Sequence, residues 1–308
     1  MKTEKGSQPR RIIDSHAHLG DIFHENRNIT FKTNVKKGDY EDRFILLESS
    51  LFTEPLFTGA ANDLQLVIDG GQFRCWEATL ENTSRQLDEC NMAGLVALPV
   101  LPNTTFEEYL AASKLDPRII PFTAADMTLS IEDMQAKLKK DIGRGAKGLK
   151  LHPILQNVRL TDDRMVAAAA VFAEVGLPVV VHIGEGTYYS DDKDYPVNSK
   201  FGAMSDFFTF ARICPDQPLI AAHCAAYAAP LMEGCAGLDN IYADTSFCSV
   251  EAARAAVNLM GADHVLFGTD YPFTNESFNI EVIERAFEDD PVTCDKVFYA
   301  NIAKLLHL

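Results

Sequence analysis

Pro178-Val179-Val180-Val181-His182 is a short run of β-branched residues that ends in a histidine. Such runs are typical of strands buried on both faces, as in a parallel sheet covered by helices. Similar apolar runs recur along the chain, and most end in a polar residue. They comprise residues 12–13, 94–100, 118–123, 148–152, 178–182, 218–223, 240–244 and 264–268.

Helical patterns lie between these runs, with apolar residues repeating at spacings of three and four. They are clearest over residues 131–138, 164–175 and 251–260, and Gly176 and Gly261 mark the ends of the last two. Strand and helix alternating eight times predicts an α/β fold, the (β/α)8 TIM barrel. A doubly wound open sheet requires the same elements and stays as the alternative.

One long segment interrupts the alternation, from about residue 20 to residue 82. It is too long for a simple connection between a strand and its helix. We expect one domain over residues 1–308, with this segment as a cap-like insertion over the C-terminal face of the barrel. Arg74 and Trp76 in the insertion are candidate substrate contacts. The insertion could equally serve only to cover one side of the barrel.

Composition excludes some classes of partner. The chain of 308 residues carries a net charge of −16, which argues against nucleic acid as a partner, because phosphate binding requires clustered Lys and Arg. No apolar run approaches the roughly 20 residues of a membrane span, and residues 1–11 lack the apolar core of a signal peptide. The seven cysteines form no CxxC pair, so we expect reduced thiols in a cytoplasmic protein.

The histidines indicate a metal site. Five of the eight lie in or just after predicted strands, at the barrel end where active sites form: His16, His18, His152, His182 and His223. The first two are two residues apart and face the same side of a strand. Asp270 follows the eighth predicted strand. Imidazole and carboxylate ligands favour Zn²⁺, and they also suit Mn²⁺ or Fe²⁺.

Neighbouring polar residues could support such a site. A divalent ion would lower the pKa of bound water to about 7, and Asp270 could accept the proton. Asp14 could orient a ligand imidazole, while Asp244 and Ser246 could line the same mouth. Glu185 could contact substrate or cap the next helix.

Several segments together resemble the amidohydrolase superfamily, most closely its amidohydrolase-related branch of TIM-barrel metal-dependent hydrolases and aminocarboxymuconate semialdehyde decarboxylase-like enzymes. The resemblance spans nearly the whole chain in the order of the family. It rests on Ile13-Asp14-Ser15-His16-Ala17-His18, on residues 147–153 with Gln156, and on residues 177–182, 222–224, 242–246, 266–272 and 301–306.

The resemblance implies a role for each matching residue. His16, His18, His182 and Asp270 would bind the metal, and His223 would bind a second metal or act as an acid or base beside a single one. Lys150 matches a lysine that is carboxylated and bridges two ions in binuclear relatives. We favour one ion and an unmodified Lys150. The chain departs from the family in one place, since alanines replace the usual glycines at positions 225 and 226.

Three functions are compatible with these residues, and the first is favoured. The chain could hydrolyse an ester, lactone or amide with metal-activated water, with Asp270 and His223 as catalytic residues. It could instead decarboxylate an aromatic or unsaturated carboxylic acid without oxidation, with either residue handling the proton. A non-catalytic metal-binding protein is the third. In both enzymes the partner is a small molecule, which His152 could help to bind, and a homo-oligomer stays open.

Overall fold

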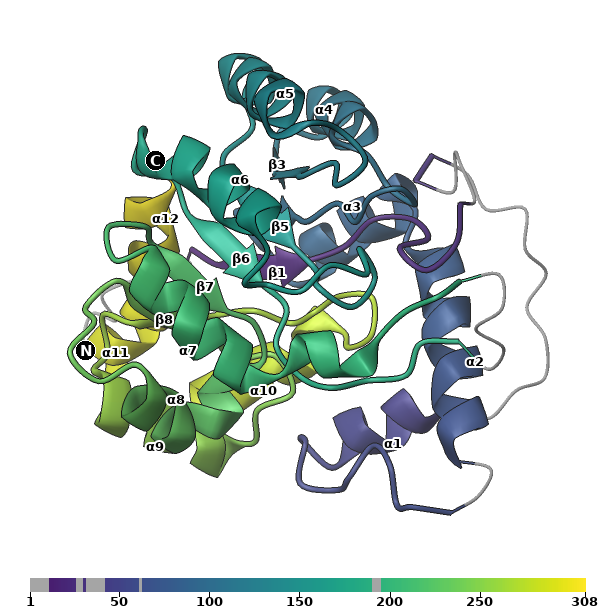
Figure 1. Ribbon diagram of the computed structural model, residues 1–308. Helices are drawn as coiled ribbons and strands as arrows, with labels where there is room; N and C mark the ends of the chain where they lie inside the picture. The colour runs from purple at the N-terminus through teal and green to yellow at the C-terminus, as the bar shows by residue number, and fades with distance from the viewer. Residues whose placement is uncertain (1–10, 26–29, 32–41, 61–62, 190–194) are drawn as a thin grey trace, which may run out of the picture.

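The structure, a computed structural model, describes residues 11–25, 30–31, 42–60, 63–189 and 195–308 (Figure 1). Parallel strands alternate with helices along the chain. The strands are β1 (Ile13–Ala17), β2 (Gly94–Ala97), β3 (Ile119–Pro121), β4 (Thr123–Ala124), β5 (Leu149–Leu151), β6 (Val179–Val181), β7 (Leu219–Ala221), β8 (Ile241–Asp244) and β9 (Val265–Leu266).

The helices confirm the three sequence patterns that predicted them, including the stops at Gly176 and Gly261. They are α1 (Arg43–Ser49), α2 (Asp63–Glu77), α3 (Leu80–Glu89), α4 (Phe106–Leu115), α5 (Ile131–Gly143), α6 (Asp163–Ala173), α7 (Met204–Ile213), α8 (Ala228–Gly234), α9 (Val250–Met260), α10 (Glu276–Ala286), α11 (Pro291–Asp295) and α12 (Asn301–Leu305). Shorter helical turns are η1 (Ser199–Gly202), η2 (Cys224–Tyr227) and η3 (Lys296–Ala300).

The order of the strands identifies the fold as a barrel. Strands β1 to β3 pair in sequence, as do β4 to β9, and every pair is parallel. A doubly wound sheet requires a reversal of strand order, which is absent from these described strands, so that alternative is wrong. The chain folds as a TIM barrel.

Two seams complete the ring. The predicted strand 118–123 forms both β3 and β4, with Phe122 between them donating its N–H to the Ala97 carbonyl at 3.0 Å. On the far side, the Ser15 N–H donates to the Phe267 carbonyl at 2.9 Å, and the Asp270 N–H donates to the His16 carbonyl at 2.8 Å. The first and last strands of the barrel are therefore neighbours.

Alternate strand residues fill the interior of the barrel. Val96, Val180 and Ile220 form a buried cluster with Ile302, Leu305 and Leu306 at the end of the chain. The residues beside them in sequence, such as Val179 and Leu219, pack in a larger cluster toward the helices. Because the terminal residues plug the start of the strands, the mouth at their C-terminal ends is left for polar side chains.

A local irregularity in β1 changes which side chains face that mouth. The register of β1 against β2 shifts between Asp14 and Ala17. Ile13 belongs to the interior cluster and Ala17 to the outer one, although residues four apart on a regular strand share a face. Past Asp14, the side chains of His16 and His18 both approach Asp270 at the mouth.

The insertion contributes α1 and α2, which lie against each other beside the barrel (Figure 1). Arg74 of α2 fastens them together and to the barrel. Its guanidinium forms two hydrogen bonds with Glu48 of α1, at 2.8 and 3.0 Å, and one with the Phe273 carbonyl at 2.8 Å. The insertion is thus tied to the loop that follows β9.

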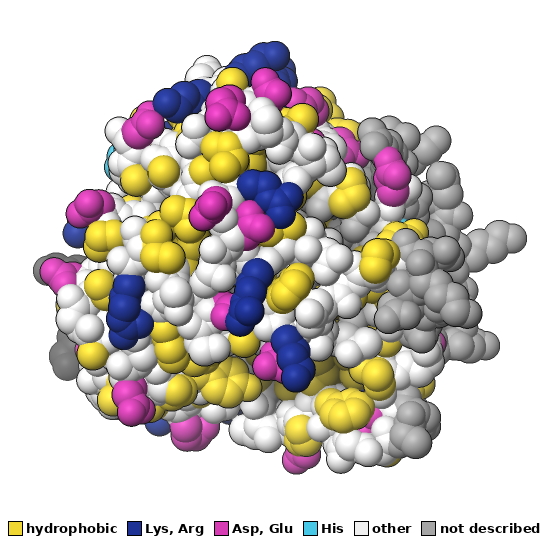
Figure 2. Space-filling view, in the orientation of Figure 1, with side chains coloured by type: hydrophobic (Ala, Val, Ile, Leu, Met, Phe, Trp, Pro, Cys, Tyr) yellow, Lys and Arg dark blue, Asp and Glu magenta, His cyan; other side chains and the backbone are white. Residues whose placement is uncertain are grey.

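Acidic and basic side chains alternate with apolar ones over the face shown in Figure 2. Within the described ranges, we find no helix whose length and apolar character would allow it to cross a membrane.

Candidate metal centre

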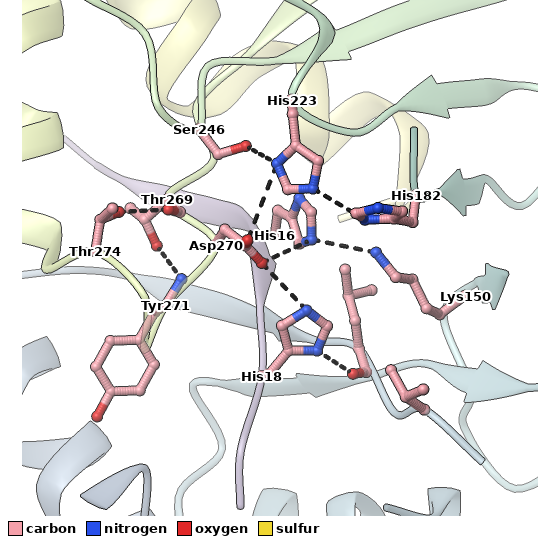
Figure 3. A network of polar contacts seen from close by, with 12 residues as sticks. His16, His18, Lys150, His182, His223, Ser246, Thr269, Asp270, Tyr271 and Thr274 are labelled. Carbon is pink, nitrogen blue, oxygen red and sulfur yellow. Dashed lines mark hydrogen bonds and ion pairs between the residues drawn. The ribbon is translucent and has the colours of Figure 1, made fainter. Parts of the chain in front are cut away.

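Three donor side chains from the two ends of the chain meet at the barrel mouth (Figure 3). The Nε2 atoms of His16 and His18 each lie 3.2 Å from Asp270 Oδ1. All three side chains offer ligand atoms within 4.8 Å of one another. Two ligands about 2.1 Å from one ion lie roughly 3 Å apart, so this spacing fits a single divalent cation.

The Nδ1 atoms of His16 and His18 are both held by hydrogen bonds within the protein. His16 Nδ1 donates to Asp244 Oδ2 at 2.9 Å, and His18 Nδ1 donates to the Leu98 carbonyl at 2.6 Å. These bonds place the ring proton on Nδ1 and leave the Nε2 lone pair facing Asp270, which is the tautomer that binds a metal. Burial lowers the pKa of His18 to about 3 and that of His16 well below its usual range, so both rings stay neutral.

The backbone at the site is held in an uncommon conformation. His223 and Asp270 both have positive φ, at 64° and 60°. Residues other than glycine seldom adopt this region, and such strain concentrates at functional sites. Gly268 permits the close packing beneath them, because a Cβ there would lie 2.8 Å from the Asp244 Cβ and 3.2 Å from the His16 Cβ.

Lys150 approaches the same centre from β5. Its register partner is Val180, a residue of the interior cluster, and Nζ lies 3.2 Å from His16 Nε2. Burial lowers the pKa of this amine to about 8, although the Asp270 and Asp244 carboxylates oppose the shift. Burial also raises the pKa of Asp270 well above its usual value, and the Lys150 charge counteracts that rise. A divalent cation beside Asp270 would likewise favour the carboxylate form.

A series of hydrogen-bonded polar side chains lies along one side of the site. His223 Nε2 lies 3.2 Å from His182 Nδ1, and His223 Nδ1 lies 2.8 Å from Ser246 Oγ. Ser246 in turn donates to Asp244, and the Tyr188 hydroxyl lies 2.9 Å from His182 Nε2. One assignment satisfies these four contacts: Tyr188 donates to His182, His182 to His223, His223 to Ser246, and Ser246 to Asp244. It leaves the Gly184 carbonyl, 3.2 Å from His182 Nε2, without a donor from that ring.

His182 therefore lies beside the three converging donors and outside their group. Within the described residues, the groups that bring three ligand atoms within 4.8 Å are His16–His18–Asp270 and His16–His223–Asp244. His182 reaches the second group only through its contact with His223. Its predicted role as a metal ligand stays a prediction.

Above these residues the mouth opens into a cavity of about 530 Å³. His182, His223 and Asp270 form part of its lining. The rest of the wall is largely apolar and includes several aromatic side chains, notably Phe23, Phe44, Tyr188, Phe247 and Phe273. Phe44 belongs to the insertion, as do Leu56, Phe57 and Leu64, which also line the cavity. The insertion thus borders the space above the candidate metal site.

Of the four residues predicted to contact substrate, only Glu185 lies exposed on the cavity wall. Glu185 is exposed and belongs to the cavity lining. His152 is buried and stacks on His182, with ring centroids 4.0 Å apart. Arg74 is held by Glu48 and Asp42, and the Trp76 indole donates to Asp21 at 2.9 Å. Both of these insertion residues are bound by the protein itself, so the structure gives no support to their predicted contacts with substrate.

Sequence reasoning missed Tyr188 and the aromatic wall. Tyr188 follows β6 by seven residues in a segment without regular periodicity, so nothing marked its side chain as part of the site. Its position just past a strand that ends in a histidine was the one available indication. The phenylalanines come from segments far apart in sequence, and only the fold brings them together.

Sequence comparison gives one family match. A family model described as "Amidohydrolase", Amidohydro_2, matches residues 89–308. The matched region holds Asp270, His223, His182 and Lys150, while β1 with its two histidines precedes it. No match is found among curated protein sequences.

Solved structures with similar folds cover nearly the whole chain. A dihydroxybenzoic acid decarboxylase from Polaromonas sp. JS666, with bound manganese and the inhibitor 2-nitroresorcinol, is 15% identical, with a TM-score of 0.64 and 97% of each chain covered. A 5-carboxyvanillate decarboxylase from Sphingomonas paucimobilis is 13% identical, with a TM-score of 0.58 and coverage of 97% of this chain and 99% of that one.

A third similar structure is a probable 2-pyrone-4,6-dicarboxylic acid hydrolase from Acinetobacter baumannii with citric acid bound. It is 14% identical, with a TM-score of 0.59, and the match covers 97% of this chain and 100% of the other. At such identities the likeness establishes a shared fold.

Proposed function

Because the chain belongs to the amidohydrolase family, we propose that it is a metal-dependent, non-oxidative decarboxylase of an aromatic carboxylic acid. The observation that carries this proposal is a cavity with aromatic side chains in its wall above a polar floor of His223 and Asp270. Aromatic side chains favour an aromatic ligand through stacked and edge-to-face contacts. The likeness to two decarboxylases supports the same choice over hydrolysis.

His16, His18 and Asp270 would hold one divalent cation. When bound, the cation supplies a positive charge that fixes an anionic substrate and draws electron density from it. Two imidazoles and a carboxylate suit Mn²⁺, Zn²⁺ and Fe²⁺. The manganese in the Polaromonas structure makes Mn²⁺ the first ion to test.

Residues that line the cavity could supply the proton that decarboxylation requires. When the bond between the ring and its carboxylate breaks, CO2 leaves and the electron pair remains on the ring carbon, which must take up a proton. His223 and Asp270 both border the cavity, and His223 Nδ1 lies 4.0 Å from Asp270 Oδ2. Either side chain could deliver that proton. The hydrogen bond between His223 Nδ1 and Ser246 Oγ orients the His223 ring.

Hydrolysis of an ester, lactone or amide is the second candidate. The same ligands could activate water, and Asp270 could accept its proton. The likeness to the probable dicarboxylic acid hydrolase favours this candidate. Our sequence-based preference for hydrolysis is nevertheless the weaker proposal, since the aromatic wall offers few polar groups to stabilise a tetrahedral oxyanion.

A turnover assay in D2O separates the two reactions. Enzyme loaded with Mn²⁺ or Zn²⁺ is offered hydroxybenzoates in one set and aryl esters, lactones and amides in another. Decarboxylation predicts CO2 release and one deuterium at the vacated ring carbon. Asp270→Asn should abolish turnover, and Asp239→Asn, at an exposed position, serves as the control. Acid released from lactones or esters, without CO2 from any aromatic acid, would refute the proposal.

A further inference from the structure

The cavity is much larger than a single aromatic ring requires. Its volume of about 530 Å³ falls in the range of pockets that bury drug-sized ligands, roughly 300 to 1,000 Å³. A benzoate with small substituents, seated against His223 and Asp270, would leave much of this space empty. An unfilled apolar pocket contributes nothing to binding, so the size of the cavity indicates a longer ligand.

The lining changes in character from floor to rim. The histidines and Asp270 lie at the floor, and the side chains that the insertion contributes to the wall are apolar. Three rim residues are large and apolar yet substantially exposed: Phe57 at 50%, Leu64 at 40% and Tyr227 at 59%. Exposed apolar residues that are continuous with a pocket mark a surface that a ligand covers.

The charges on the described part of the wall disfavour a ligand that carries a second carboxylate at its far end. The lining that the structure describes includes neither lysine nor arginine. Its acidic members are Asp270 at the floor and Glu185, which is exposed higher on the wall. A carboxylate at the far end of a ligand would find no cation among these residues and would be repelled by Glu185. Such repulsion discriminates against the wrong ligand as effectively as new contacts favour the right one.

We infer that the cavity selects an aromatic acid with one carboxylate and an extended apolar substituent, such as an alkyl chain or a second ring. The carboxylate end lies at the floor by His223 and Asp270, and the substituent follows the wall toward Leu56 and Leu64. This inference rests on the proposed function for the reacting end alone. The substituent contacts the wall whichever bond is broken.

A homologous series tests the inference on the metal-loaded enzyme. The substrates are 2-hydroxybenzoate and its derivatives with ethyl, butyl and hexyl chains, together with a matched derivative whose chain ends in a second carboxylate. Each buried methylene should lower KM by about three- to fourfold. The value of kcat should change little, because contacts far from the reacting carbon act equally on the ground and transition states. The second carboxylate should cancel the gain.

Two variants and one control locate the effect on the wall. Leu64→Asp should raise KM for the hexyl substrate at least tenfold relative to the unsubstituted one. Leu259→Asp, at a residue of α9 that is 50% exposed and does not line the cavity, is the matched control and should leave this ratio unchanged. Glu185→Lys should lower KM for the substrate with a terminal carboxylate. Circular dichroism and metal content verify that each variant is folded.

Binding measured without turnover separates this inference from the proposed reaction. In the inert analogues a nitro group replaces the carboxylate, and calorimetry gives Kd along the same series. If Kd falls with chain length while no acid is decarboxylated, the reaction is wrong and the inference holds. If 2-hydroxybenzoate is decarboxylated but neither KM nor Kd improves with the chain, the reaction holds and the inference is overturned. A Leu64→Asp variant that keeps the full preference for the hexyl substrate also overturns it.

Discussion

Replacing Arg74 by methionine should destabilise the protein strongly. The guanidinium contacts both carboxylate oxygens of Glu48, at 2.8 and 3.0 Å, and the Asp42 carboxylate at 2.9 Å. Glu48 is only 1% exposed, so water cannot replace the lost partner. Removing one member of a buried ion pair costs about 3 to 5 kcal/mol, because the other charge is left buried without compensation.

This loss converts into a measurable shift in melting temperature. Unfolding carries an entropy of about 2.1 cal/mol/K per residue, which for 308 residues is roughly 0.65 kcal/mol/K. The variant should therefore melt about 5 to 8 °C below the wild type. Arg285→Met is the control, because that guanidinium is 59% exposed and its partner Glu281 is 45% exposed, so the loss of this ion pair should barely change the melting temperature.

A double-mutant cycle then isolates the pair. Glu48→Met alone leaves Arg74 without its bidentate partner and also removes an acceptor from the Asn275 N–H. The double variant Arg74→Met/Glu48→Met leaves neither charge of this pair buried, so its loss of stability should be smaller than the sum of the single losses by about 2 kcal/mol. Denaturant unfolding followed by circular dichroism gives all four free energies of unfolding. Additive losses would refute this account of Arg74.

Three further predictions concern the buried charges. Asp244→Asn weakens the hydrogen bond that orients His16, so it should raise the metal Kd about 10- to 100-fold in a chelator competition. Lys150 should carry no added CO2 by intact mass, with one metal per chain by elemental analysis. Glu276 is buried without a hydrogen-bond partner among the described residues, and burial raises its pKa from 4.5 to about 8. Between pH 4.5 and 8 the folded protein therefore keeps a proton that the unfolded chain releases, so the stability of the wild type falls as pH rises through this range. Relative to the wild type, Glu276→Gln should gain about 3 kcal/mol of unfolding free energy between pH 4.5 and 7. Denaturant unfolding at several pH values measures this difference.

Each of these three predictions would be contradicted by a specific result. An unchanged metal Kd in Asp244→Asn would mean that His16 needs no orienting partner. Two ions per chain with a mass gain of one CO2 would identify Lys150 as a bridging carboxylate. A pH-independent difference between Glu276→Gln and the wild type would mean that this carboxyl titrates normally when folded.

The strands and the donors could be predicted because their signals are local. A buried parallel strand is apolar over its whole length, so the runs ending at His182 and His223 stand out in the sequence. The spacing of His16 and His18 places both on one face, and Asp270 closes the last strand. Parallel strands bring their ends to the same side of the barrel, so these residues meet whatever the intervening helices contain.

What could not be predicted depends on contacts between distant segments. Arg74 was a candidate substrate contact, but its guanidinium is bound by Glu48 and the Phe273 carbonyl. No periodicity in the sequence reveals that α2 packs against the loop after β9. The break at Phe122 between β3 and β4 has no local signal either: the Phe122 N–H donates to Ala97 and the next N–H, of Thr123, donates to Gly148. His182 turns toward His223, which depends on side-chain torsions that spacing does not specify.

The three converging donors also lie across the seam where the barrel closes. His16 and His18 belong to the first strand and Asp270 follows the last, and the hydrogen bond from the Asp270 N–H to the His16 carbonyl joins the same two segments. A ribosome releases β1 long before it has made β9, so neither the ring nor the ligand set can be completed until nearly the whole chain has emerged. An ion held by these side chains would cross-link the first strand to the last, so metal binding and final assembly of the barrel would stabilise each other.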